Sequence, residues 1–182
     1  MRNMNYEIRS GYKYTVSGLS KLIVFIFLIS IIAGGCYSFK DVSIPPEVKT
    51  ARVNYIENKA QYINPQLAPQ LTDRLRQKIN NQTRLTLIQG DEADYDITAV
   101  IRNYTVTTSG ISDQQAATNR LIITVHITFR NNLDEKANFE ADISRNFDFN
   151  ANLSLQQAEA QKGEEILQNL TDEIFNRIFS NW

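Results

Sequence analysis

The sequence predicts an α+β fold, a two-layer sandwich in which two helices pack on one face of a four-stranded mixed sheet. Three segments between residues 95 and 149 alternate apolar and polar side chains, as strands with one buried face do. Two other segments, residues 64–82 and 154–182, repeat apolar residues every fourth position, which is typical of amphipathic helices. Apolar faces of these two kinds must cover each other. The expected element order is β-α-β-β-β-α.

The first strand is expected at about residues 48–56, where Ala51, Val53 and Tyr55 recur at period two. Two consecutive prolines lie just before it, and proline favours extended backbone over helix. The domain is therefore expected to begin near Glu47.

The first helix is expected next, because four apolar residues recur at intervals of four on one face. They are Leu67, Leu71, Leu75 and Ile79. Asn64 and Pro65 have the residue types of a helix cap and of a first helical position. Pro69 lies one turn later and moves the expected start closer to residue 68. Residues 84–89 are expected to form a short extended piece after this helix.

Three further strands are expected at residues 95–106, 120–130 and 139–149. The middle one has the clearest alternation of apolar and polar side chains. A polar connection, residues 107–118, is expected to join the first two strands. Residues 131–138 are rich in Asn and Asp and are expected to form the turn between the last two.

The last segment predicts a long C-terminal helix. Ser154 and Gln157 have the spacing of a capping box, and apolar residues then recur every fourth position up to Trp182. Such a broad apolar face is expected to pack against the apolar face of the sheet. We therefore expect residues from both helices and from the middle strand to share one core. They are Leu71, Leu75, Ile123, Val125 and Ile174.

The N-terminal region has the layout of a secretory signal peptide. A segment with four basic residues and one acidic residue precedes the apolar run at residues 22–32, and three small residues then precede Cys36. The run is too short to span a bilayer, which requires about 20 apolar residues. The small residues before the cysteine resemble the lipobox of bacterial lipoproteins, in which the thiol is lipidated and the chain is cut before it. The alternative is a signal anchor that stays embedded, with Cys36 as an idle thiol.

This layout divides the chain into three parts. Residues 1–35 are expected to be a lipoprotein signal peptide, residues 36–46 a lipidated tether, and residues 47–182 a single α/β domain. Lipidation anchors a protein strongly, because each buried methylene contributes about 0.8 kcal/mol. Cys36 is therefore expected to be an anchor and not a catalyst.

The composition argues against several classes of function. The formal net charge is −1, and no basic run with interleaved aromatic residues indicates a nucleic-acid binder. His126 is the single histidine and is expected on the polar face of its strand, which leaves a metal site or a nucleophile pair without partners. The acidic stretch "GDEADYD" lacks the ligand pattern of an EF-hand and is expected to be a solvated turn. We expect no enzyme activity, no metal and no cofactor.

Several stretches resemble the LPS-assembly lipoprotein (LptE-like) family of Bacteroidota. They are "GCYSFKDVSIPPEVKTARVNYIENKA", "NPQLAPQLTDRLRQKINNQTRLTLI", "ATNRLIITVHITFRN", "NFDFN" and "IFNRIFSNW". The last of these ends the expected C-terminal helix, and "NFDFN" lies ahead of that helix. The resemblance implies an outer-membrane lipoprotein, anchored through Cys36 on the periplasmic face, that plugs and helps assemble the β-barrel LPS translocon. It implies an LptD-like barrel as the partner, with lipopolysaccharide as a second candidate partner, at the final step of lipopolysaccharide transport.

The polar connection is the candidate barrel-facing loop, because the lumen of an outer-membrane barrel is polar. Its candidate residues are Ser109, Ile111, Ser112, Asp113, Gln114 and Gln115. Together with the hairpin at residues 131–136, this loop is expected to form the end of the domain that enters or faces the lumen. It contains no Lys or Arg, so no contact to lipid phosphates is carried over from the family.

Other interpretations remain open at this point. A lipoprotein module of a secretion pore, or a periplasmic synthase activator, shares the plan of a strand, a helix and a sheet behind a lipidated cysteine. A tethered hydrolase would need a convergent nucleophile, base and orienting group. Phe179 or Trp182 could also contact a partner instead of completing the core.

Overall fold

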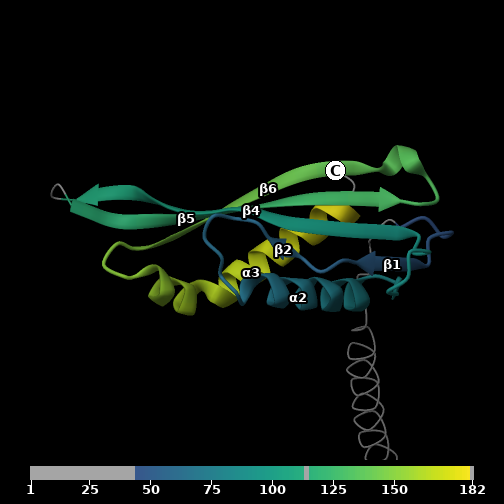
Figure 1. Ribbon diagram of the computed structural model, residues 1–182, viewed down its shortest axis with the longest axis horizontal. Coiled ribbons are helices and arrows are strands. Elements are labelled where there is room, and N and C mark those ends of the chain that lie inside the picture. The colour runs from purple at the N-terminus through teal and green to yellow at the C-terminus, as the bar shows by residue number, and fades with distance from the viewer. Residues whose placement is uncertain (1–43, 113–114, 181–182) are drawn as a thin grey trace, which may run out of the picture. The chain divides into compact units, whose positions relative to one another are not determined.

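The computed structural model describes residues 44–112 and 115–180, together with the side chains of these residues except those of 111, 112 and 115–117. The described residues belong to one compact unit, Asp41–Trp182. Its elements are β1 (Thr50–Val53), β2 (Glu57–Asn58), α2 (Leu67–Gln82), β3 (Thr86–Leu87), β4 (Tyr95–Ser112), β5 (Gln115–Asn131), the 3-10 helix η1 (Glu135–Ala137), β6 (Phe139–Asn150) and α3 (Leu155–Phe179). Figure 1 shows both long helices on the same face of the sheet.

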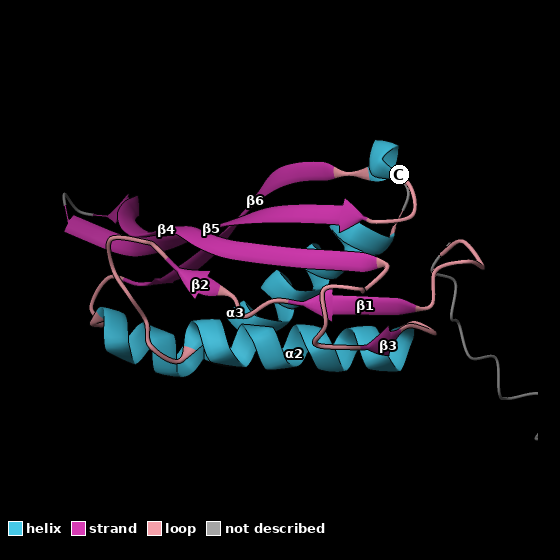
Figure 2. Ribbon diagram, turned by 45° about the vertical axis from the view of Figure 1, so that its right-hand side comes forward, coloured by secondary structure: helices cyan, strands magenta, loops and turns pink. Residues whose placement is uncertain are grey.

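The sheet is mixed, as predicted, but its strands number six and not four. They follow the order β3-β1-β4-β5-β6, with β2 also paired to β4. The strand β1 runs parallel to β3 and β4, whereas β5 pairs antiparallel with both β4 and β6. Figure 2 shows the short strands β1, β2 and β3 along one side of the sheet.

The two extra strands are β2, just after the first predicted strand, and β3, in the predicted extended piece. Only Thr50–Val53 of the segment expected as a strand at residues 48–56 forms a strand, β1, and β2 follows beyond that segment at Glu57–Asn58, because the chain leaves the sheet between them. The backbone N–H of Ile56 donates to Thr72 Oγ1 of α2 at 3.0 Å instead of to a neighbouring strand. The extended piece at residues 84–89 forms β3 against β1.

The predicted cap of α2 is only partly right: the N-cap position is Gln66, whose side chain makes no capping hydrogen bond, and Pro65 lies outside the helix. Asn64 Oδ1 accepts hydrogen bonds from the backbone N–H groups of Gln66 and Leu67, at 2.9 Å and 3.2 Å. The helix begins at Leu67, so Pro69 lies in the first turn. Proline is tolerated there because the first N–H groups of a helix have no acceptor within it.

The capping box of α3 is confirmed. Ser154 Oγ accepts from the Gln157 N–H at 3.2 Å, and Gln157 Oε1 accepts from the Ser154 N–H at 2.9 Å. The helix ends at Phe179, and Ser180 lies beyond it in extended backbone. Trp182, expected as the end of the apolar face, lies outside the described residues.

The predicted core is confirmed. Its five residues have no exposed surface and belong to one cluster formed by both helices and the sheet: Leu71, Leu75, Ile123, Val125 and Ile174. Fully burying a side chain of this size stabilises a fold by about 1.5–3 kcal/mol. The two-layer packing is therefore the main source of stability.

The predicted polar connection at residues 107–118 is wrong as a loop, because both flanking strands continue through it. Cross-strand pairs between β4 and β5 extend as far as Ser112 and Gln115. Residues 105–108 are Thr, Val, Thr and Thr, and these β-branched side chains favour strand backbone even where they are polar. The connection is therefore a long β-hairpin.

Candidate functional site

The β4–β5 hairpin contains most of the candidate barrel-facing residues. We define the hairpin arm as residues 106–112 of β4 with residues 115–120 of β5. Figure 1 shows this hairpin running past the N-terminal ends of both helices. Side chains 106–109 are all exposed. The arm is held to the domain by backbone pairing, while side-chain burial stops close to its base.

Four of the six candidate residues lie towards the end of this arm. Ser109 is on β4, and its Oγ donates to the backbone oxygen of Thr118 at 3.3 Å. The strand positions Ile111, Ser112 and Gln115 belong to the paired backbone. Asp113 and Gln114 lie outside the described residues. The structure thus places the four described positions close to the tip of a hairpin.

The expectation that the hairpin at residues 131–136 shares an end with these positions is wrong. Consecutive connections between antiparallel strands lie at opposite ends of a sheet. The pair Ser112↔Gln115 marks one end of β5 and the pair Tyr95↔Asn131 marks the other. The 17 residues of β5 separate these ends by roughly 55 Å at ~3.3 Å per residue.

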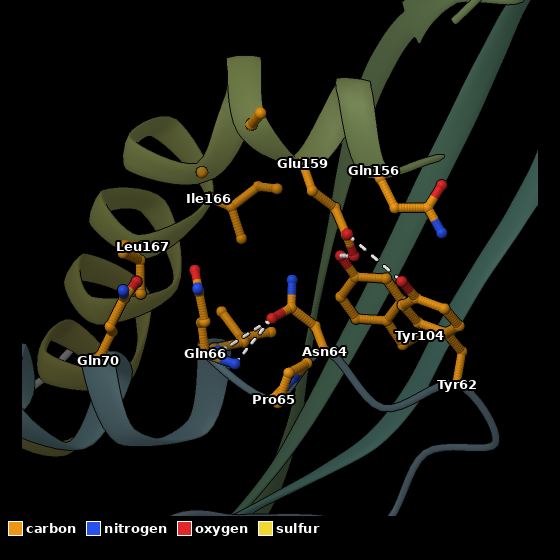
Figure 3. Close-up of a pocket in the computed structure, with 13 residues that line it drawn as sticks. Tyr62, Asn64, Pro65, Gln66, Gln70, Tyr104, Gln156, Glu159, Ile166 and Leu167 are labelled. Atoms are coloured by element: carbon orange, nitrogen blue, oxygen red, sulfur yellow. Dashed lines mark hydrogen bonds between the residues drawn. The ribbon is translucent and has the colours of Figure 1, made fainter. Parts of the chain in front are cut away.

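A cavity of about 350 Å³ lies at the base of the arm. It is bounded by the start of α2, the first half of α3 and β4, and Figure 3 shows the side chains that point into it. Its lining combines apolar side chains such as Leu67 and Ile166 with amide side chains that can hydrogen-bond: Asn64, Gln66, Gln70 and Gln156. Glu159 is the one acidic residue among its lining residues.

A cluster of Tyr62, Tyr104 and Glu159 closes one side of this cavity. Tyr104 Oη donates to Glu159 Oε1 at 2.6 Å, and Tyr62 Oη donates to Oε2 at 3.3 Å. The two rings are stacked, with centroids 5.2 Å apart. The cluster therefore links the segment before α2, the strand β4 and the helix α3 at one point.

Burial and the neighbouring carboxylate keep both tyrosines protonated. Desolvation raises the pKa of Tyr104 well above its usual range, and the hydrogen bond and charge of Glu159 raise it further. Desolvation is also the largest cause that raises the pKa of Tyr62, followed by the charge of Glu159. A tyrosine with a raised pKa stays protonated at neutral pH, so it donates a hydrogen bond and is not available to accept a proton. The geometry indicates a structural cluster and not a general acid–base pair.

Sequence reasoning missed this cluster, although one signal was present. Tyr62, Tyr104 and Glu159 are far apart in the chain, and only the fold brings them together. Glu159 lies seven residues before Ile166, so it falls on the apolar stripe of α3. An acidic residue on such a stripe indicates a buried partner, which here is Tyr104.

The acidic stretch at residues 90–96 is only partly the solvated turn that was expected. Asp91 is exposed, but Asp94 Oδ2 accepts from the N–H groups of Lys49 and Thr50 at 2.8 Å and 2.9 Å. These backbone hydrogen bonds lower the pKa of Asp94. Asp96 accepts from Arg52 Nε at 3.0 Å and from Arg52 Nη2 at 2.9 Å. Asp94 and Asp96 therefore join β1 and its N-terminal approach to the start of β4.

The polar face of the sheet carries His126, as predicted. Its Nδ1 lies 2.7 Å from Asp142 Oδ1, and its Nε2 lies 3.4 Å from Glu140 Oε2.

Residues 44–112 and 115–180 contain no group of His, Cys, Asp and Glu side chains placed to hold a metal ion. In the same part of the chain, no helix is long and apolar enough to cross a membrane. Cys36 lies outside the described residues, so its lipidation stays a prediction.

The sequence matches the LptE family, described as lipopolysaccharide-assembly, over residues 48–178. Among solved structures, rare lipoprotein B from Shewanella oneidensis is 14% identical with a TM-score of 0.47, over 70% of this chain and 92% of that chain. A minor lipoprotein from Acinetobacter baumannii is 13% identical with a TM-score of 0.48, over 71% and 91%. A PelC dodecamer from Paraburkholderia phytofirmans is 8% identical with a TM-score of 0.45, over 74% and 90%. No curated protein sequence gives a match.

Proposed function

The chain belongs to the LptE lipopolysaccharide-assembly family, and from this premise we propose that it is an outer-membrane lipoprotein of lipopolysaccharide transport. It plugs an LptD-like β-barrel translocon and assists the assembly of that barrel at the final step of export to the cell surface. The family is a non-enzymatic lipoprotein family, so the proposed role is one of binding.

The observation that carries this proposal is the extent of the family match. Residues 48–178 include every strand and helix of the described domain apart from the last residue of α3. The match therefore includes both helices, the sheet and the hairpin arm. The function is proposed for this domain as a whole and not for a single motif.

The anchoring part of the proposal places Cys36 in the membrane and limits how far the domain can move from it. Arg84 Nη2 donates to the backbone oxygen of Ile44 at 2.8 Å, and Ile44 itself is buried. Eight residues of chain therefore lead from the proposed anchor, Cys36, to Ile44. At ~3.5 Å per residue, those eight or so residues span roughly 28 Å. A domain on this tether stays close to the periplasmic leaflet.

The position of the tether also favours the hairpin arm as the part that enters a lumen. Ile44 and Val48 border the same cavity as Tyr95 and Asn131, which lie at the opposite end of β4 and β5 from the arm. The arm therefore points away from the tethered end. It can enter the barrel while the tethered end stays at the periplasmic surface.

The chemistry of the arm fits a polar lumen better than a lipid headgroup. Arg120, at the base of the arm, pairs with Asp148 at 2.7 Å, and residues 103–119 contain no Lys or Arg that could pair with a phosphate. Ser, Thr, Asn and Gln make up most of this stretch, as expected for a plug in a polar, water-filled lumen. We therefore propose the barrel, and not lipopolysaccharide, as the partner of the arm.

Photo-crosslinking in membranes tests this proposal. A photoreactive residue at Ser112 or Gln114 should capture an outer-membrane barrel protein, while one at Leu133, exposed at the opposite end, should capture it far less. Depletion of this lipoprotein should leave the barrel immature and retain lipopolysaccharide short of the cell surface. Crosslinks only between copies of this chain would favour a pore-forming module instead. Normal surface lipopolysaccharide after depletion would remove the proposed function.

A further inference from the structure

The strand β4 has neighbours on both sides over only its first half. It pairs with β1 at Tyr95–Ile97 and with β2 at Val100 and Ile101, and the last backbone hydrogen bond on this side runs from Lys59 N to Ile101 O at 2.9 Å. Beyond Ile101, the described chain pairs β4 with β5 alone. We define the open edge as residues 103–108 of β4. Six residues of strand are about 20 Å long.

The register identifies the backbone groups that this edge leaves unpaired. Ile97 and Ile101 turn their carbonyl groups away from β5, towards residues 54 and 59. The bulge at Arg102 shifts the alternation by one residue, so that Tyr104 and Val106 now lie opposite Ile123 and Leu121. The N–H and C=O groups of Tyr104, Val106 and Thr108 therefore face away from β5. They are unpaired among the residues that the structure describes.

The open edge lacks the protection that the other long edge of the sheet has. Natural edge strands are usually protected by charged side chains or proline, because an unpaired edge is a template for pairing with another strand. The edge strand β6 has four charged residues: Glu140, Asp142, Arg145 and Asp148. The open edge has none, and β-branched residues occupy positions 105–108. Val106 is 38% exposed.

We propose that the open edge pairs, by β-augmentation, with an edge strand of the barrel partner before that barrel closes. The inference rests on the proposed function and names the surface through which assembly would act. A barrel has unpaired edge strands only while it is unclosed, since closure pairs every strand. Backbone pairing requires no particular partner sequence, which suits a template strand.

Two features of the open edge favour a barrel strand as its occupant. Its residues alternate between small polar side chains on the charged face of the sheet, at Asn103, Thr105 and Thr107, and the larger Tyr104 and Val106 on the helix-covered face. Barrel strands alternate in the same way between lumen and lipid. The absence of charge also lets an apolar lipid-facing residue lie beside the edge without desolvating an ion.

Proline substitutions on the two edges give a matched test. Val106→Pro removes an N–H that faces away from β5, so it should leave the hairpin paired. Arg145 and Phe147 turn their backbone N–H and C=O groups towards β5. Asn146 lies between them, so its N–H faces the outer edge of β6. Asn146→Pro is therefore the control for a proline on an edge strand. Val106→Lys and Asn146→Lys repeat the comparison with an added charge.

The assay is recovery of the barrel protein with each full-length variant from membranes. Wild type and both Asn146 variants should recover it equally, and both Val106 variants should recover at least tenfold less. Equal recovery by all variants would overturn the open-edge inference and leave the proposed function intact. No barrel recovered with wild type would contradict the proposed function itself. Should Val106→Pro lower the thermal midpoint, Val106→Lys still decides the question.

A crosslinker placed on the edge identifies the occupant directly. A photoreactive residue at Thr108 should capture the unfolded or partly folded form of the barrel more than the mature form, whereas one at Ser144 on β6 should capture neither. Capture of a second copy of this chain from Thr108 would assign the open edge to self-association and overturn the inference.

Discussion

The sheet has two regions that are stabilised in different ways. One is the two-layer body, which we define as α2, α3 and the part of the sheet that they cover, and the other is the hairpin arm. In the body, residues such as Leu75 and Ile174 have no exposed surface. In the arm, side chains 106–109 are exposed, and pairing between β4 and β5 holds the backbone. The body can therefore fold on its own core, whereas the arm gains little from burial. A surface of that kind is suited to a partner that supplies the missing contacts.

The largest expected effect is in the body. Leu75→Ala or Ile174→Ala should lower the free energy of unfolding by about 2–5 kcal/mol, because each leaves a cavity in the shared core. Thermal denaturation of the soluble domain measures this effect. An unchanged midpoint for either variant would show that the two layers are not packed as described.

The second effect concerns the cluster at the junction between arm and body. Tyr104→Phe removes a 2.6 Å hydrogen bond to Glu159 in a buried setting and should cost about 1.5–3 kcal/mol. Tyr62→Phe is the matched control, since its hydrogen bond to the same carboxylate is longer, at 3.3 Å. Equal losses for the two variants would contradict the larger contribution assigned to the shorter hydrogen bond of Tyr104.

These two effects differ in how far sequence could foresee them. The core and the capping box of α3 were predicted, because periodicity and a Ser–Gln spacing are local signals. The tyrosine–glutamate cluster was not, because its members become neighbours only through the fold. Residues 107–112 of β4 were predicted as part of a loop, because the threonines at 107 and 108 are polar and their preference for extended backbone was not recognised. The separation of the two hairpins followed from topology alone and was overlooked.

The third effect is a pH dependence located in the body. Backbone hydrogen bonds from Lys49 and Thr50 lower the pKa of Asp94. A carboxyl group with a lowered folded pKa stabilises the fold above its unfolded pKa, about 3.9, and that contribution is lost as pH falls through the folded value. Asp94→Asn should therefore lower stability at pH 7 and flatten the loss of stability below about pH 4. Denaturant unfolding at several pH values measures this slope, and Asp91→Asn, at an exposed position, is the control. The same slope for Asp94→Asn and wild type would contradict the assignment.

The smallest effect on stability is expected in the arm. Thr107→Ala should change the free energy of unfolding by less than about 0.5 kcal/mol, because its side chain is exposed and makes no contact that burial strengthens. Denaturant unfolding beside wild type checks this value. A loss comparable to that of Leu75→Ala would place the arm within the core and remove the contrast between the two regions.

Affinity purification of the full-length chain from membranes, followed by mass spectrometry of the recovered proteins, tests the proposed partnership most directly. An LptD-like outer-membrane β-barrel should be recovered in near-equal amount with the chain, and a signal-segment-free N-terminus at a lipidated Cys36 should be found in the same sample. Recovery of the chain only with copies of itself, or with a periplasmic synthase and no barrel, would contradict the role as a barrel plug.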